Sequence, residues 1–217
     1  SIAQEIERVA KEQRDQMEAF LQSYGDSDVA PFFIEVNMLR MMSLEQIAAF
    51  YDRFTDRVKQ TEKGKEMGER IAQLKRLAPG SPAPEFELTT PDGGKLALKD
   101  LRGHIVLIDF WASWCEPCMD EMPNVKAIYE KYHDRGLEIV GVSMDNNKAN
   151  WERAIERAGL VWHHVSSLKG MNRCSVAKLY QVVAIPKLYI IGKDGKIIAK
   201  DLRGEELREK IDELFEE

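Results

Sequence analysis

The chain has 217 residues, of which 44% are hydrophobic and 31% are charged, and its formal net charge is −6. These values are ordinary for a globular protein with one large domain or two small ones. The pI of about 5.4 gives no support for a nucleic-acid partner, and no apolar run approaches the ~20 residues that cross a membrane.

The first third of the chain differs in composition from the rest. Residues 1–78 contain one Pro and three Gly, but none of the three Cys, four His or four Trp. Apolar residues recur at three- and four-residue steps, which is typical of amphipathic helices. The pattern predicts an all-helical N-terminal module with helices over residues 2–24, 31–42, 43–54 and 67–77.

This helical module shows no catalytic constellation. We interpret its Met and aromatic stripes as core, with a partner or dimer surface as the alternative, because the second helix is apolar almost all round. The chain begins with Ser1-Ile2 rather than Met. That start indicates processing or trimming and leaves room for a removed export signal.

Residues 79–84 have the composition of a linker, and strands alternate with helices after it. A second domain is therefore expected over 79–217, with a mixed α/β sheet flanked by helices. The expected strands cover residues 86–89, 95–98, 105–110, 137–143, 160–165, 187–191 and 196–199. The expected helices cover residues 119–134, 147–159, 176–180 and 205–215.

Two cysteines separated by two residues follow the apolar strand at 105–110 and lie where a helix begins. The N–H groups and dipole at a helix start stabilise a thiolate, so Cys115 is expected to be the attacking group. Cys118 lies one turn on, near enough to resolve a mixed disulfide. Pro117 suits the first helical turn, and Trp114 gives apolar cover beside the sulfur. The spacing predicts reversible dithiol–disulfide chemistry without a cofactor.

Two acids accompany the cysteines, and each has two interpretations. Asp109 ends the apolar run of the strand, so it is either a surface-facing acid or a buried carboxyl with a raised pKa that relays protons to and from Cys118. Glu121 follows Cys118 on the same helix face. It is either an exposed helix acid or a second proton-handling group.

The stretch 109–118, Asp-Phe-Trp-Ala-Ser-Trp-Cys-Glu-Pro-Cys, closely resembles the active site of the thioredoxin superfamily. Cys-Glu-Pro-Cys with Glu121 and Pro123 resembles the TlpA/ResA branch of bacterial extracytoplasmic thiol–disulfide oxidoreductases. The lead-in at 79–103 and the additional helix and strand at 147–165 are similar to that branch as well. Helical segments similar to 1–78 precede such domains in Bacteroidetes proteins.

The resemblance implies a thioredoxin-like fold, protein disulfide substrates and a thiol electron donor. It also implies a cis-proline loop at Ile185-Pro186 that faces the cysteines and leaves the Ile185 backbone free to pair with a substrate strand. This chain has Ile where the family more often has Thr. We expect Trp114, Pro117, Ile185 and Pro186 to bind substrate. An extracytoplasmic or periplasmic location, with a membrane anchor in a full-length precursor, follows from the same resemblance.

The remaining candidates favour structural roles. Cys174 is expected to be a free, semi-buried thiol, with a regulatory or resolving role as the alternative. His163 and His164 do not complete a zinc set with it, because such sites need paired ligands at fixed spacing. Met119 follows Cys118, so the haem-attachment motif Cys-x-x-Cys-His is absent.

Two other functions remain open. A thiol peroxidase would share the fold, but residues 108–115 lack the Pro-x-x-x-Thr-x-x-Cys pattern of that class. A partner-binding module is the second alternative, in which segment 1–78 captures a partner and the redox domain maintains its cysteines. The favoured function is the reduction of protein disulfides through Cys115 and Cys118.

Overall fold

The computed structural model describes residues 2–38 and 44–216 and divides the chain into two compact units, Ser1–Arg76 and Leu77–Glu217. Composition places the change after residue 78, slightly later than this division. Leu77 is only 2% exposed and packs in the core of the second unit, which explains the difference. Within the described residues, no helix is both long and apolar enough to span a bilayer.

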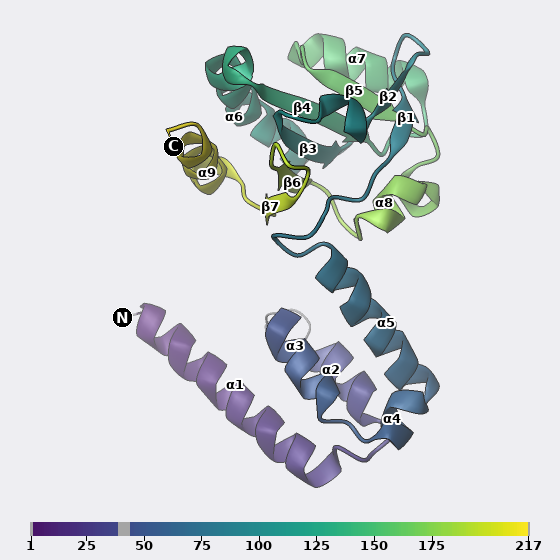
Figure 1. Cartoon of the computed structure of the whole chain (residues 1–217), viewed down its shortest axis with the longest axis vertical. Helices are drawn as coiled ribbons and strands as arrows, with labels where there is room; N and C mark the ends of the chain where they lie inside the picture. Colours follow the sequence, from purple (N-terminus) through teal and green to yellow (C-terminus); the bar gives the residue numbers. More distant parts are fainter. Residues whose placement is uncertain (1, 39–43, 217) are drawn as a thin grey trace. The chain divides into compact units, whose positions relative to one another are not determined.

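The first unit consists of helices, drawn in purple to blue in Figure 1. Their bounds are α1 (Ile2–Tyr24), α2 (Ala30–Met38), α3 (Leu44–Asp52), α4 (Asp56–Gln60) and α5 (Glu62–Arg76). The expected second helix extends to residue 42, and its last four residues lie outside the described part. Helix α4 is not predicted by periodicity. It is a single short segment whose N-cap, Thr55, accepts a hydrogen bond from the Val58 N–H.

The core of the first unit contains some of the Met and aromatic residues that form stripes along its helices. Met17 and Phe54 are buried there, as expected for core residues. Tyr24 and Phe32 are instead 58% and 53% exposed, so the aromatic stripe is only partly core. Phe20 stacks on Phe33 with ring centroids 4.2 Å apart.

The second unit is built on one mixed sheet in the strand order β2-β1-β5-β4-β3-β6-β7 (Figure 1). Strands β3, β4 and β5 run parallel, and every other pairing in this sheet is antiparallel. The bounds are β1 (Glu87–Thr89), β2 (Lys95–Ala97), β3 (Ile105–Trp111), β4 (Leu137–Ser143), β5 (His163–Ser166), β6 (Lys187–Ile191) and β7 (Ile197–Lys200). The predicted mixed α/β sheet flanked by helices is confirmed.

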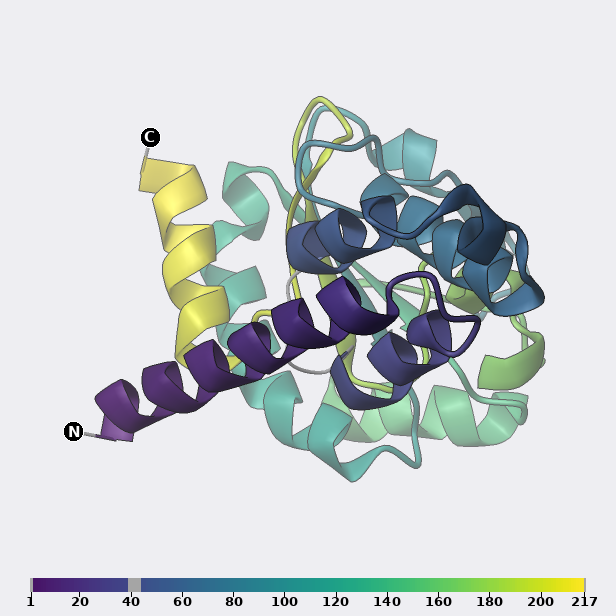
Figure 2. The same cartoon turned by 90° about the horizontal axis from the view of Figure 1, so that it is seen from below.

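Helices cover the sheet on both faces. The parallel connections β3-α6-β4 and β4-α7-β5 are expected to be right-handed, which places α6 and α7 on the same face. Helix α9 packs beside α6 in both views (Figure 1 and Figure 2). The helices are α6 (Glu116–Tyr132), α7 (Lys148–Ala158), α8 (Ser175–Leu179) and α9 (Gly204–Glu216), with short 3-10 turns at η1 (Leu98–Leu101), η2 (His133–Arg135) and η3 (Met171–Arg173).

Strand β3 is the centre of this sheet, and all seven of its residues are buried. It pairs in parallel with β4 and antiparallel with β6. Side chains alternate along a strand, so Phe110 and Trp111 face opposite sides. Phe110 contacts Tyr180, the C-cap of α8, with ring centroids 5.4 Å apart. Asp109 and Trp111 therefore face the side of the sheet that is covered by α6 and α7.

Gly141 on β4 provides a test of this packing. A Cβ atom there would lie 2.7 Å from His164 Nδ1 and 2.8 Å from Trp111 Nε1, on two buried rings that have little room to move. Gly141→Ala should lower the free energy of unfolding by about 1–3 kcal/mol. All four Trp lie in the second unit, so tryptophan fluorescence during urea unfolding reports this change.

Gly94→Ala is the matched control. Its new Cβ would meet only the Thr90 and Asp92 side-chain oxygens of an exposed turn, at 3.1 Å and 3.4 Å. Its stability should stay within about 0.5 kcal/mol of the parent. Equal unfolding midpoints for Gly141→Ala and the parent would contradict the packing around β4.

Candidate active site

Cys115 and Cys118 form a disulfide at the start of α6. Cys115 is the N-cap residue, and its Sγ accepts a hydrogen bond from the Cys118 N–H over 3.3 Å. Cys115 is 5% exposed and Cys118 only 1%, so Cys115 is the more exposed residue of the pair. The end of β3 and the start of α6 thus place the dithiol where helix N–H groups favour a thiolate.

A buried carboxylate, Asp145, holds the loop that precedes the dithiol. It accepts hydrogen bonds from the Ser113 N–H at 3.0 Å and the Ser113 hydroxyl at 2.6 Å. The Ser143 hydroxyl donates a third bond at 2.8 Å. Sequence reasoning missed Asp145. The available signal is its place just after β4, because the carboxyl ends of parallel strands meet at one edge of the sheet.

Asp109 is buried in β3, with 3% of its surface exposed, so the surface-facing interpretation is wrong. Burial raises the pKa of its carboxyl to about 7, and the negative charge of Glu121 adds to this rise. The positive charge of Arg203 acts in the opposite direction and lowers that pKa. The result is a carboxyl that exchanges its proton near neutral pH.

Glu121 is half-buried and hydrogen-bonded, so it is not a free acid on the helix surface. Its Oε1 accepts from the Gly204 N–H at 2.8 Å and from the Asn124 amide at 2.7 Å. The bond from Gly204 joins α6 to the first residue of α9, and the bond from Asn124 lies within α6. The carboxylate therefore has a structural function, and it also acts on Asp109 through its charge.

The Ile185–Pro186 peptide bond is cis, and it directly precedes β6. The Arg203 guanidinium donates a hydrogen bond of 2.5 Å to the Pro186 carbonyl. The charge of Arg203 also lowers the pKa of Asp109, so one side chain is hydrogen-bonded to the proline loop and acts electrostatically on the buried carboxyl. Sequence reasoning missed Arg203 because the contact joins distant parts of the chain.

Exposed apolar groups occur next to these elements. Trp114, which precedes Cys115, is 61% exposed, and Val183, ahead of the cis bond, is 84% exposed. Pro117 is exposed as well, whereas Ile185 is half-buried and Pro186 is buried. Large apolar side chains at such exposure are suited to contact with another molecule.

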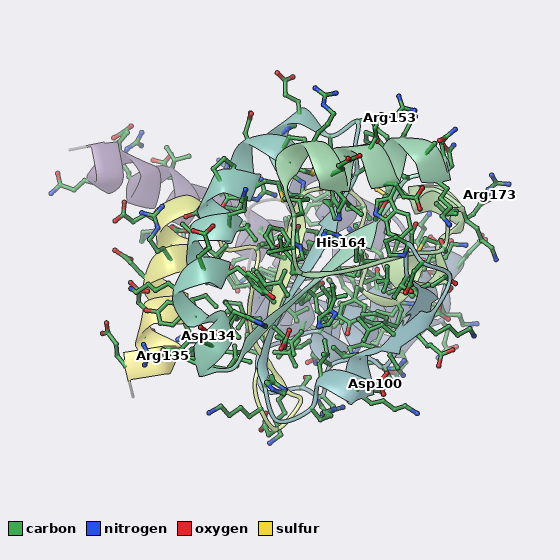
Figure 3. The ribbon with its side chains drawn as sticks, turned by 90° about the horizontal axis from the view of Figure 1, so that it is seen from above. Asp100, Asp134, Arg135, Arg153, His164 and Arg173 are labelled. Atoms are coloured by element: carbon green, nitrogen blue, oxygen red, sulfur yellow. A yellow bond between two sulfur atoms is a disulfide. The ribbon has the colours of Figure 1, made fainter. Side chains whose placement is uncertain are left out.

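The other predicted candidates lie apart from this chemistry. Cys174 is free and fully buried at the N-cap of α8. His163 pairs with Glu138 at 3.1 Å, while His164 lies inside the unit (Figure 3), where burial lowers its pKa to about 4. Within residues 2–38 and 44–216, no group of His, Cys, Asp or Glu is arranged to hold a metal ion.

Comparison with known proteins agrees with this geometry. The model of the AhpC/TSA family matches residues 79–200. The chain is 32% identical to the thiol-disulfide oxidoreductase ResA of Bacillus cereus over 145 residues, which cover 67% of this chain and 81% of that relative.

Solved structures give the same result. The thioredoxin domain of a thiol-disulfide oxidoreductase from Bacteroides vulgatus superposes with a TM-score of 0.60 at 34% identity, covering 64% of this chain and 99% of that one. A thiol:disulfide interchange protein from Bacteroides sp. superposes with a TM-score of 0.60 at 33% identity, covering 65% and 92%. The chain therefore belongs to the AhpC/TSA family and is a thioredoxin-like oxidoreductase similar to the ResA-type thiol–disulfide oxidoreductases.

Proposed function

We propose that this oxidoreductase reduces protein disulfides, with Cys115 as the nucleophile and Cys118 as the resolving thiol. The observation that carries the proposal is the Cys115–Cys118 disulfide at the start of α6, in which Cys115 is the more exposed partner. The structure holds the oxidised form, which is the product of the resolving step.

The reaction begins with the reduced pair. The Cys115 thiolate attacks a substrate disulfide, forms a mixed disulfide and releases one substrate sulfur as a thiolate. Cys118 then loses its proton and attacks the Cys115 sulfur. The pair becomes a disulfide, and the second substrate sulfur leaves with the electron pair. A separate thiol donor returns two electrons and restores the dithiol.

Asp109 is the proposed acceptor of the Cys118 proton. A carboxyl with a pKa of about 7 is ionised in about half of the molecules at neutral pH, so it can take a proton and later return it. Glu121 is a positioning residue in this scheme, because its charge adds to the rise in the Asp109 pKa that burial causes. Its own bonds to Asn124 and Gly204 keep it in place.

The substrate is proposed to lie across Trp114, Pro117, Ile185 and Pro186. The exposure of Trp114 and Pro117 supports this assignment. In the proline loop, the hydrogen bond from Arg203 fixes the Pro186 carbonyl. The neighbouring Ile185 backbone is suited to pairing with an extended substrate strand.

The proposal extends to place and partners. We place the protein outside the cytoplasm, as the resemblance to the TlpA/ResA branch implies, with an anchor in a longer precursor. The first unit is proposed as a contact for a partner or a second copy. Exposed Tyr24, Val29 and Phe32 support this role.

Cysteine variants test the order of steps. Cys115→Ser should abolish disulfide reduction, because the attacking thiolate is lost. Cys118→Ser should accumulate a mixed disulfide on Cys115, which non-reducing mass spectrometry detects. Cys174→Ala is the control and should leave the rate unchanged, since that thiol is fully buried. The mechanism would be refuted if Cys115→Ser still reduced disulfides. It would also be refuted if the parent consumed peroxide rapidly and did not reduce disulfides.

The pH profile tests the role of Asp109. In the parent, the rate of mixed-disulfide resolution should rise with pH around a midpoint near 7, as Asp109 ionises. Asp109→Asn cannot accept the proton, so resolution should slow by about 100-fold and lose this midpoint. Stopped-flow fluorescence between pH 5 and 9 measures both quantities.

Glu121→Gln is the matched variant for this test. It removes a negative charge but keeps an oxygen that can accept from the Gly204 N–H. Because the Glu121 charge raises the pKa of Asp109, its loss should move the midpoint to lower pH. Identical pH profiles for the parent and Asp109→Asn would show that Asp109 does not handle the proton.

A further inference from the structure

A groove runs beside the dithiol loop between α6 and α7. Its first part is a hollow of about 470 Å³ lined by Ser113, Met119, Asn150, Arg153, Ala154, Arg157 and Ala158. A second hollow of about 390 Å³ shares Met119 and Ala158 with it and continues along α6 to Glu130. Ser113 is the residue that Asp145 holds in place, so one end of the groove is part of the loop that carries Cys115.

The first hollow is positively charged. Arg153 and Arg157 are exposed, stand one helical turn apart on α7 and both line it. Neither guanidinium forms an ion pair with any residue of the described segments, whereas Lys148 and Glu152 on the same helix pair with each other. In Figure 3, Arg153 lies on α7 at the edge of the molecule. The second hollow also has Glu130 in its lining, so the positive charge is concentrated next to Ser113.

This charge is opposite to that of the whole chain, which is −6. Two unpaired arginines in a concave surface favour planar anionic groups, because guanidinium binds carboxylates through paired hydrogen bonds. Their position matters as well. A protein that is covalently bound to Cys115 must pass over the surface around the dithiol loop, and this groove adjoins that loop.

We propose that the groove binds an acidic segment of the protein substrate, close in sequence to the disulfide that is reduced. The proposal rests on the proposed function and names the substrate class. The carboxylates of that segment bind Arg153 and Arg157, and the methylene groups of the same acidic side chains contact Met119. The groove thereby selects substrates by charge before the covalent step. This selection acts mainly on the rate of association.

The test compares two synthetic peptides with the same disulfide. One has three Glu residues beside the cysteine, and the other has three Gln residues. The pre-reduced full chain is mixed with each peptide, and the second-order rate constant is followed by tryptophan fluorescence. The parent should react about fivefold faster with the acidic peptide at low salt, and this preference should fall as salt is added.

The double variant Arg153→Gln/Arg157→Gln should react with both peptides at similar rates, while its rate with the neutral peptide stays at the parental value. The control is Lys169→Gln/Arg173→Gln, which removes the same charge from exposed positions elsewhere. Arg173 lies at a different edge of the molecule from Arg153 (Figure 3). This control should keep the preference for the acidic peptide.

The outcomes separate this proposal from the proposed function. If the parent reduces both peptides equally, or if the groove variant keeps the acidic preference, the groove does not bind acidic segments although disulfide reduction stands. If the control loses the preference too, net charge and not the groove is responsible, and the proposal is overturned. If the parent reduces neither peptide, the proposed function itself fails.

Discussion

The burial of β3 is the constraint on which the second unit depends. A strand that pairs on both edges and is covered on both faces has to be apolar. The sequence of β3 is Ile-Val-Leu-Ile-Asp-Phe-Trp, and six of these seven residues are apolar. Asp109 is the exception. Ionising a carboxyl in such surroundings is costly, so its proton is retained up to about pH 7. The same packing that stabilises the sheet thus raises the pKa of the one carboxyl in this strand.

Two buried carboxylates near the loop illustrate how surroundings determine chemistry. Asp145 accepts three hydrogen bonds from Ser113 and Ser143, which makes it an anchor for the backbone. Asp109 instead has Glu121 and Arg203 as its electrostatic neighbours, and their opposite charges tune its affinity for a proton. The same functional group therefore holds the loop backbone at one position and has a raised pKa at the other.

Local patterns in the sequence predicted what local physics determines. The dithiol, the apolar run of β3 and the alternation of strands and helices could be read directly, because each depends on neighbouring residues. Asp145 and Arg203 could not, since their contacts with Ser113 and Pro186 arise only when distant segments meet. The interpretation of the N-terminal Met and aromatic stripes as core holds only in part, because Phe32 of the second helix is exposed. A pattern shows which residues are apolar and not how many neighbours cover them.

The complete burial of Cys174 has a kinetic consequence. A mixed disulfide can in principle be attacked by any thiol of the same chain, and each additional attacker opens a branch that ends in a scrambled, inactive isomer. A sulfur without exposed surface is outside this competition as long as the fold persists. In the proposed mechanism, Cys118 is consequently the only other thiol of this chain that can attack the adduct on Cys115, and its competitor is the released substrate thiolate, which reverses the first step.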